Sequence, residues 1–187
     1  MISAQNKALN ELTADTDFTI EHYRLLLQLD IKNYKVVSYA NIPWGERFVL
    51  WRHDMDYSMN RGLALARIEA ELGVKATYFI NPHSEFYNIA EAGQHSVIQE
   101  IISLGHDLGL HFDAAFYEIQ SEQDLSKRIQ QDVTYIQQLF QKLPTAFSFH
   151  NPSAPHLTFE SDYYGGSLNC YSKRFKSAVP YCSDSNG

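Results

Sequence analysis

The sequence predicts an α/β protein whose mainly parallel β-sheet is covered by helices, and two observations lead to this prediction. Short runs rich in apolar residues alternate along the chain with longer stretches whose apolar residues recur at helical spacing. The short runs are almost continuously apolar, which is typical of strands buried on both faces of a parallel sheet. A helix between two strands provides the crossover that parallel pairing needs. The resulting order βαβαβαβ fits either an open sheet or a sheet rolled into a barrel.

The expected strands are short and dense in Val, Phe, Leu and Trp. In chain order they cover Lys35–Tyr39, Arg47–Arg52, Ala76–Ile80, Asp107–Phe112 and Ala146–His150. No linker, low-complexity tract or internal repeat divides this series. We therefore expect one domain over residues 1–187, with residues 1–17 as a flexible or peripheral N-terminal segment.

The expected helices combine an apolar stripe with capping residues. Thr19 and Ser58 are candidate N-caps, and glycines follow two of the stripes as stop signals. In chain order the helices run from Thr19 to Asn33, from Ser58 to Gly73, from Val97 to Gly105 and from Leu125 to Pro144. In the second of these helices, Glu69 and Glu71 are expected on a solvated face.

Composition and charge exclude several classes of function. The 187 residues are 44% hydrophobic and 20% charged, as in an ordinary globular protein. The formal net charge of -7 argues against a nucleic-acid partner, because phosphate binding needs clustered Lys and Arg. No run approaches the ~18 apolar residues of a membrane span, and the polar N-terminus lacks a signal peptide, so a cytoplasmic location is expected. Cys170 and Cys182 are expected to be reduced thiols.

Polar residues follow three of the expected strands at the point where each strand ends. Asp54 and Asp56 follow the second strand, His111 and Asp113 lie at the end of the fourth, and His150 follows the fifth. Sites in parallel sheets gather at the carboxyl ends of the strands, so these side chains are expected at one edge. Imidazole and carboxylate ligands suit zinc and its first-row neighbours. The sequence therefore predicts a metal site there.

Each of these residues also has a purely structural interpretation. Asp56 would serve equally well as the cap of the following helix. A single histidine at a strand end is more often packed than metal-bound, and His106 is expected to be a packed, hydrogen-bonded histidine because alternation sends it to the face opposite His111. The coincidence of three such groups at one edge favours the metal site.

Two segments resemble motifs of the polysaccharide deacetylases, the carbohydrate esterase family with a NodB-homology domain. Residues 51–58 read WRHDMDYS and residues 105–111 read GHDLGLH, similar to the family's first and second motifs. The resemblance runs from about Thr19 to Pro152. It implies a deformed (β/α) barrel of mainly parallel strands with outer helices, and one expectation is that this barrel is incomplete at its C-terminal end. It also implies that Asp54 is the catalytic base and that Asp56 and His111 hold a divalent metal ion, with zinc as the leading expectation.

The chain departs from the family pattern at three places. The family's second ligand histidine falls on Ala115, and its arginine-containing third motif reads FHNP here, so His150 is the predicted third ligand with Asp113 as its competitor. The fourth motif resembles residues 181–185, with Asp184 as its acidic residue. The final Leu-x-His motif, which supplies the family's general acid, is absent. Either the chain is truncated after Gly187 or His53 or His83 replaces that acid.

The predicted function is the metal-dependent hydrolysis of acetyl groups from an N-acetylated sugar or glycan, with O-deacetylation left open. The residues assigned to substrate binding are Asn81, His83, Asp113 and Asp184. The alternative is a carbohydrate-binding or scaffold domain that kept the fold and lost catalysis. Asp54 argues against this alternative, because a structural metal site needs no second aspartate beside its ligand. The sequence predicts no particular oligomeric state.

Overall fold

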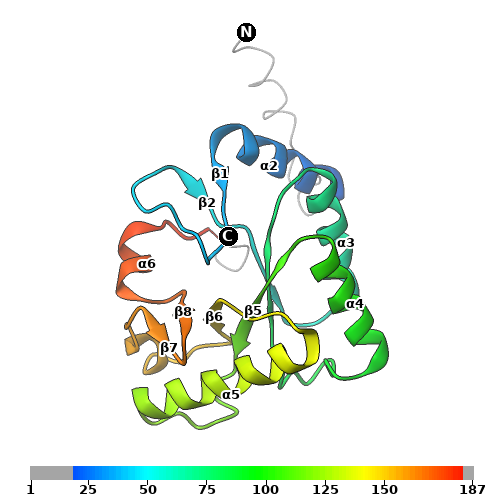
Figure 1. The fold of residues 1–187 in the computed structure, drawn as a ribbon. Helices are drawn as coiled ribbons and strands as arrows, with labels where there is room; N and C mark the ends of the chain where they lie inside the picture. The colour runs from blue at the N-terminus through cyan, green and yellow to red at the C-terminus, as the bar shows by residue number, and fades with distance from the viewer. Residues whose placement is uncertain (1–18, 183–187) are drawn as a thin grey trace.

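Six strands form one sheet in which five neighbours run parallel and one edge strand runs antiparallel (Figure 1). The computed structural model describes residues 19–182. In spatial order the strands of this sheet are β3 (Arg52–Met55), β4 (Thr77–Ile80), β5 (Asp107–Phe112), β6 (Ala146–Phe149), β8 (Ser167–Asn169) and β7 (Tyr163–Tyr164). A separate parallel pair consists of β1 (Lys35–Val36) and β2 (Phe48–Val49). The predicted α/β class with a mainly parallel sheet is confirmed.

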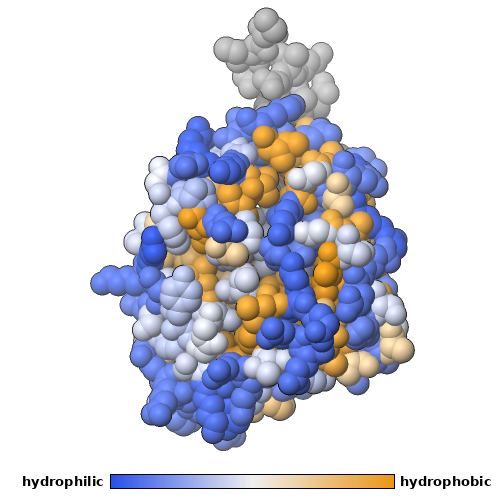
Figure 2. Space-filling view, viewed as in Figure 1, coloured by the Kyte–Doolittle hydropathy of each residue, from blue (hydrophilic) through white to orange (hydrophobic). Residues whose placement is uncertain are grey.

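Helices connect the parallel strands and lie outside the sheet (Figure 1). They are α2 (Ile20–Asn33), α3 (Met59–Glu71), α4 (Ala92–Ser103), α5 (Glu122–Phe140), the 3₁₀ turn η2 (His156–Thr158) and α6 (Lys173–Ala178). The expected caps are present: Thr19 accepts a hydrogen bond from the His22 N–H at 3.1 Å, and Ser58 accepts one from the Arg61 N–H at 3.4 Å. The lower part of the surface in Figure 2, where α5 lies, is mainly hydrophilic. No helix within residues 19–182 is long and apolar enough to span a membrane.

The segment expected as one strand over Arg47–Arg52 is divided between two sheets. Residues 48 and 49 pair with β1, whereas the chain joins the main sheet only at Arg52 and continues to Met55. The intervening Leu50 and Trp51 are half-buried by side-chain packing, so their apolar character reflects burial and not strand pairing. As a consequence Asp54 lies inside β3 and not beyond its end.

The strand pairing within the described residues gives an open sheet with β3 and β7 at its edges. Closure into the expected barrel therefore stays a prediction, as does the single-domain organisation over the whole chain. Residues 1–17, predicted to form a peripheral segment, lie outside the described residues. Cys170 and Cys182 are free thiols, and burial raises the pKa of Cys170 to about 12.

Two apolar clusters cover the two faces of the sheet. The larger cluster lies between the sheet and α3, α4 and α5, and it contains Tyr78, Leu110 and Phe147. The smaller cluster lies on the other face and includes Phe79 and Ala146 with Phe175 of α6. Successive residues of a strand point to opposite faces of the sheet. The residues of neighbouring strands that pair with Phe79 and Ala146 therefore also point away from α3, α4 and α5. This second face carries the polar residues described below.

At the amino end of the sheet, Asp107 holds several segments together. Its carboxylate lies 2.9 Å from Lys142 Nζ and 3.0 Å from Lys75 Nζ, and it accepts a hydrogen bond of 2.7 Å from the Ser38 hydroxyl. Burial opposes ionisation, but the hydrogen bonds from Lys142, Ser38 and Lys75 outweigh it and lower the pKa of Asp107. The beginning of β5 is thereby tied to the segments that precede β4 and β6.

Gly109 of β5 is required by the ring that packs over it. Phe79 pairs with Gly109 across the β4–β5 ladder and is fully buried. A Cβ atom at position 109 would lie only 2.5 Å from Cδ1 of the Phe79 ring. The same ring contacts Tyr39 edge-to-face at 5.5 Å and lies 4.9 Å below the Arg52 guanidinium. Displacing Phe79 would therefore disturb both the core and Arg52.

We predict that Gly109→Ala lowers the free energy of unfolding by about 1–3 kcal/mol, because the added methyl group overpacks a rigid, buried contact. Denaturant titration of both proteins measures the change. The matched control is the same substitution in a Phe79→Leu background, where the ring is absent and Gly109→Ala should cost clearly less. Equal costs in the two backgrounds would show that Phe79 is not the reason for glycine at this position.

Candidate metal centre

The register of the parallel strands aligns the candidate residues. Asp54, Phe79 and Gly109 form one row across β3, β4 and β5. Two residues further along β5, on the same face, is His111, which pairs with Ser148 of β6. Asp56 follows directly after the end of β3. The ladder between β5 and β6 continues one step further, where the His150 N–H donates to the Phe112 carbonyl at 2.8 Å. His150 is thus placed beside His111 by backbone hydrogen bonding.

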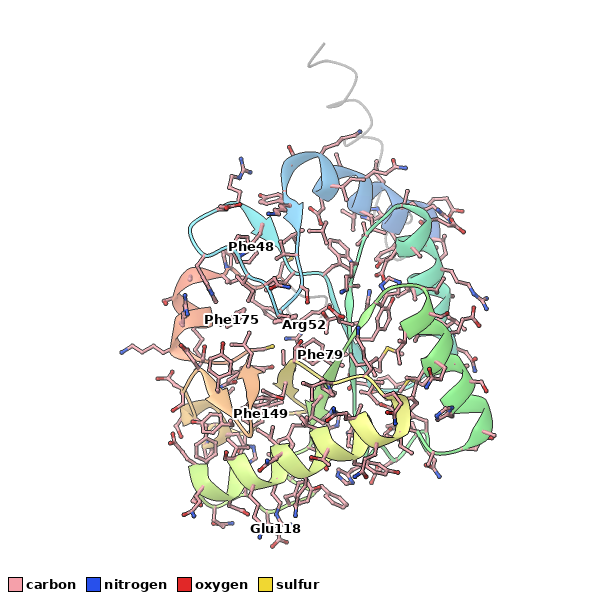
Figure 3. All side chains as sticks on the ribbon, viewed as in Figure 1. Phe48, Arg52, Phe79, Glu118, Phe149 and Phe175 are labelled. Carbon is pink, nitrogen blue, oxygen red and sulfur yellow. The ribbon has the colours of Figure 1, made fainter. Side chains whose placement is uncertain are left out.

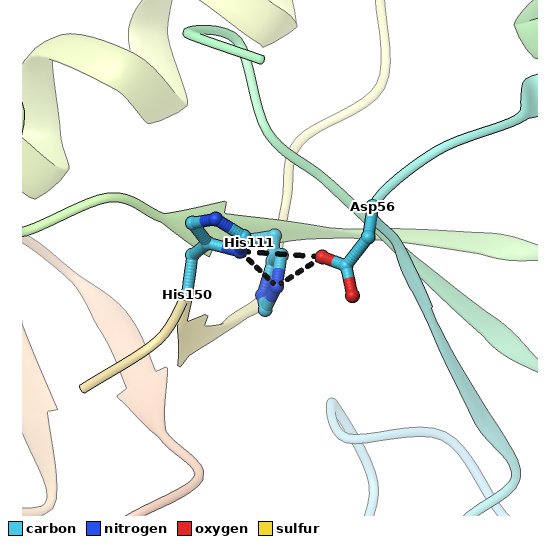
Figure 4. Close-up of side chains that lie close together, drawn as sticks. All are labelled: Asp56, His111 and His150. Atoms are coloured by element: carbon cyan, nitrogen blue, oxygen red, sulfur yellow. Dashed lines mark hydrogen bonds and ion pairs between the residues drawn. The ribbon is translucent and has the colours of Figure 1, made fainter. Parts of the chain in front are cut away.

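Three side-chain atoms converge at this edge of the sheet (Figure 4). The Asp56 Oδ1 atom lies 3.0 Å from His111 Nε2 and 3.2 Å from His150 Nδ1. The two imidazole nitrogens are 3.2 Å apart. A tetrahedral zinc ion with bonds of about 2.0–2.2 Å separates its ligand atoms by roughly 3.3–3.5 Å, only a few tenths of an ångström more than observed. One carboxylate oxygen and two imidazole nitrogens in this arrangement fit a divalent metal ion.

The protonation chemistry of the cluster is compatible with a cation. Contact with His111 is the largest influence on Asp56 and outweighs burial, so the pKa of Asp56 is lowered, with a smaller effect from His150. The carboxylate is therefore ionised at neutral pH. Although Asp56 Oδ1 is buried and close to both rings, it makes no well-aligned hydrogen bond with any residue of the described part of the chain. A shared metal ion would satisfy all three atoms at once.

Asn151 is positioned to orient His150. The Asn151 amide nitrogen lies 3.0 Å from His150 Nε2, and the residue adopts a positive φ of 43°, which asparagine tolerates better than most residues. Turning the amide over would let its oxygen accept a hydrogen bond from Nε2–H. That tautomer leaves Nδ1 free as a ligand, which is how outer groups commonly orient metal-binding histidines.

Asp54 lies on the sheet face that carries His111, two positions before Asp56 in the chain, and is fixed by Arg52. The Arg52 guanidinium donates to Asp54 Oδ2 at 2.5 Å and to the Ser148 hydroxyl at 2.7 Å, and it lies against the Phe79 ring at the centre of the molecule (Figure 3). The second oxygen, Asp54 Oδ1, is buried and accepts no hydrogen bond from residues 19–182. One oxygen is therefore anchored and the other is left as an acceptor.

The role of Arg52 was missed at the level of sequence. A usable signal existed, because residues two apart on a strand share a face and an arginine at that spacing can pair with Asp54. Strand alternation alone does not show that this arginine also reaches Ser148, which is 96 positions later in the chain.

A pocket of about 520 Å³ adjoins the cluster. Asp56 and His150 line it, and so do three of the residues predicted to bind substrate: Asn81, His83 and Asp113. The fourth, Asp184, lies outside the described residues. The remaining lining residues are Ser84, Glu85, Phe86, Ala115, Phe116 and Asn151.

Asp113, the predicted competitor of His150, has a different local role. Its Oδ1 atom accepts hydrogen bonds from the N–H groups of Ala115 at 3.0 Å and Phe116 at 3.1 Å, which shapes the loop after β5. It does not belong to the cluster formed by Asp56, His111 and His150. The geometry therefore favours His150 over Asp113 as the third ligand.

His53 and His106 take part in a separate buried network around Glu69. Glu69, expected on a solvated face, is fully buried, so that expectation is wrong. Its carboxylate lies 2.5 Å from His53 Nε2, accepts a hydrogen bond from Tyr23, and accepts another from Tyr78 at 2.6 Å. His106 is buried, as expected for a packed histidine. Its ring nitrogens are hydrogen-bonded to the backbone of α3 and to the backbone of the residue before β4. His53 does not line the pocket.

Comparisons with known proteins give limited similarity. No protein family matches the sequence, and a search of curated proteins finds no relative. Among solved structures, the chitin deacetylase from the fungal pathogen Colletotrichum lindemuthianum is similar to this chain, with a TM-score of 0.42 and 19% sequence identity. The match covers 54% of this chain and 43% of the chitin deacetylase chain. At this level the similarity identifies neither a family nor an activity.

We predict that the protein binds about one zinc ion per chain and that His111→Ala and His150→Ala each lose most of it, because three protein ligands are needed for a stable site. Equilibrium dialysis against zinc followed by elemental analysis measures the content. Asp113→Ala is the matched control and should keep the ion. If His150→Ala binds zinc like the wild type while Asp113→Ala does not, the assignment of the third ligand is reversed.

Proposed function

We propose that this protein is a metal-dependent hydrolase that removes acetyl groups from an N-acetylated sugar or glycan, as a divergent member of the polysaccharide deacetylase family. The observation that carries the proposal is the placement of Asp54, with one free carboxylate oxygen, on the same sheet face as the cluster of Asp56, His111 and His150. Zinc is the ion that best suits this ligand set, and the deformed (β/α) barrel of the family is the proposed complete fold.

The metal ion and Asp54 would divide the chemistry between them. Asp56, His111 and His150 would hold a divalent ion, which would supply the Lewis acidity that makes water more acidic and polarises an acetyl carbonyl. Asp54 acts as the general base: its Oδ1 atom accepts the proton of the attacking water. Arg52 keeps Asp54 oriented through Oδ2, so that Oδ1 remains directed to its task.

The pocket next to the cluster suits a sugar. A volume of about 520 Å³ lies within the usual range for small-molecule sites. Phe86 and Phe116 line it and are 64% and 58% exposed, and Tyr57 packs against Phe86 with ring centroids 4.8 Å apart. Exposed aromatic rings that gather at a pocket favour ligand contact.

The charge of the pocket narrows the substrate class. Its lining includes the carboxylates of Asp56, Glu85 and Asp113 but neither lysine nor arginine. Away from the metal cluster, Glu85 and Asp113 disfavour phosphate or carboxylate groups on the substrate by like-charge repulsion. The pocket is compatible with a neutral acetylated sugar and with the cationic amine that deacetylation releases.

The second candidate function is a carbohydrate-binding domain without catalysis, favoured by Ala115 at the position of the family's second ligand histidine. The two functions differ in what they require of Asp54. A binding domain needs no free acceptor oxygen beside the cluster, whereas hydrolysis depends on it.

We predict that the zinc-loaded protein releases acetate from short oligomers of N-acetylglucosamine, and that Asp54→Asn lowers kcat by about 100- to 10,000-fold because the general base is lost. Acetate release is measured by a coupled enzymatic assay, and zinc content by elemental analysis. Asp54→Asn should keep its zinc. The matched control is Glu46→Gln, which changes an exposed carboxylate elsewhere on the surface and should leave kcat unchanged.

A zinc-loaded wild type that binds these oligomers but releases no acetate from N- or O-acetylated sugars would contradict the hydrolase and support the binding domain. Activity that survives Asp54→Asn would contradict the role of Asp54 as base.

A further inference from the structure

We propose that His83, oriented by Asp132, is the general acid that protonates the leaving amine. The inference rests on the proposed hydrolase function and adds to it a catalytic residue and a positioning residue. Its basis is the pairing of His83, a half-buried residue of the pocket lining, with the buried carboxylate of Asp132, both outside the metal cluster.

His83 lies in the loop after β4 and lines the same pocket as Asp56 and His150. The backbone N–H of His83 donates to the Asn81 side chain at 2.9 Å, which fixes the loop. Its ring stacks on Phe116 with centroids 3.9 Å apart and planes within 12°. The ring is therefore held in one orientation at the pocket, as a proton donor in catalysis must be.

Asp132 holds one nitrogen of this ring. Its side chain is only 4% exposed, and its Oδ1 atom lies 3.0 Å from His83 Nε2. The Tyr117 hydroxyl donates to the same oxygen at 2.6 Å and lies 2.9 Å from Nε2. Burial, together with this hydrogen bond to Asp132, raises the pKa of Tyr117, so the phenol keeps its proton and remains a donor.

The position of Asp132 in α5 is unusual for an acidic residue. It lies on the buried face of the helix, together with Ile129, Val133 and Ile136. Burying a carboxylate at a core position costs free energy unless the carboxylate is paired. An apolar residue could fill the same space without this cost. Its partners are Tyr117 and His83, and His83 lines the pocket. This placement favours a role in orienting His83 over a role in packing.

The pair fixes which nitrogen exchanges protons. Asp132 accepts from Nε2–H and stabilises the protonated ring, as the buried aspartate does for the histidine of a serine protease. Nδ1 makes no hydrogen bond with the described residues, so it is the nitrogen that can exchange a proton in the pocket. An imidazole nitrogen can both give and take up a proton, as a donor that must be reloaded in every cycle has to do.

The proposed hydrolysis consists of the addition of water followed by cleavage of the carbon–nitrogen bond. Water adds its oxygen to the acetyl carbon and gives one proton to Asp54. The carbon–nitrogen bond then breaks, and its electron pair goes to the nitrogen, which takes the Nδ1 proton of His83. Acetic acid and the free amine leave, and the acid gives its remaining proton to solvent to become acetate. Asp54 releases its proton to solvent, and His83 takes one up.

The other candidates for this acid are less well placed. His53 does not line the pocket, and its Nε2 atom is engaged by the buried Glu69. His150 is the second histidine of the pocket lining, and it belongs to the metal cluster. Among the described lining residues, His83 is thus the histidine left to donate a proton.

The test compares two acetyl substrates that differ in their leaving group. An amide of N-acetylglucosamine cannot expel its amine without a proton, whereas p-nitrophenyl acetate expels a stable anion. We expect His83→Gln to lower kcat for the sugar amide by about 100-fold or more and to leave kcat for the aryl ester nearly unchanged. Asp132→Asn should show the same selectivity with a smaller loss. Both variants should keep their zinc.

A second readout does not depend on turnover. Long-range ¹H–¹⁵N NMR should show His83 as the Nε2–H tautomer in the wild type, with this preference weakened in Asp132→Asn. The matched control for activity is His95→Gln, which alters a half-buried histidine stacked on Phe140 at 4.9 Å and away from the pocket lining. It should leave both activities intact.

The outcomes separate this inference from the proposed function. A wild type that cleaves neither substrate contradicts both. If the wild type is active but His83→Gln and His83→Asn reduce both substrates equally, or neither, the acid role of His83 is overturned while the hydrolase stands. An Nδ1–H tautomer in the wild type overturns the role of Asp132. Retained zinc and ester hydrolysis show that a variant is folded.

Discussion

Four strands, β3 to β6, pair in parallel with a register that puts Asp54, His111 and Ser148 on one face of the sheet, with Asp56 directly after the end of β3, and the candidate site depends on this register. Because side chains alternate between faces, a slip of one residue in β5 would turn His111 toward α3, α4 and α5 and separate it from Asp56. The hydrogen bond from the His150 N–H to the Phe112 carbonyl extends the same ladder beyond β6. Backbone pairing thus helps to bring together Asp56, His111 and His150, although Asp56 and His150 are 94 positions apart in the chain.

The stabilising ion pairs and the candidate metal cluster lie at opposite ends of these strands. At the amino end, Asp107 binds Lys75 and Lys142, and no pocket residue takes part. At the carboxyl end, Asp56 Oδ1 lies close to two imidazole nitrogens but makes no well-aligned hydrogen bond with any of residues 19–182. The connection between the two ends is a column of packed residues. Gly109 leaves room for Phe79, and Phe79 supports the guanidinium of Arg52. The order of the core is in this way transmitted to the orientation of Asp54, the proposed base.

The sequence predicted most of what depends on local pattern. The α/β class, the capping roles of Thr19 and Ser58 and the grouping of Asp56, His111 and His150 at one edge all follow from periodicity, capping chemistry and strand alternation. The start of β3 could not be predicted, because apolar residues occur both in paired strands and in packed connections.

Buried charges were the harder part. A glutamate or aspartate in a helix is usually solvated, so the burial of Glu69 could not be expected without knowledge of its partners. Those partners come from distant segments: Tyr23 for Glu69, and His83 for Asp132. Local pattern does not encode such pairs. In the case of Asp132, its position within an apolar stripe of α5 was a signal that sequence analysis could have used.

The measurement that tests the central claim most directly is anomalous X-ray diffraction at the zinc edge from crystals grown with zinc. The account predicts one strong anomalous peak within about 2.0–2.2 Å of Asp56 Oδ1, His111 Nε2 and His150 Nδ1, with a fourth position open toward the pocket. An ion bound elsewhere, or a peak that contacts the two histidines but not Asp56, would contradict the claim that strand register builds a three-ligand metal centre.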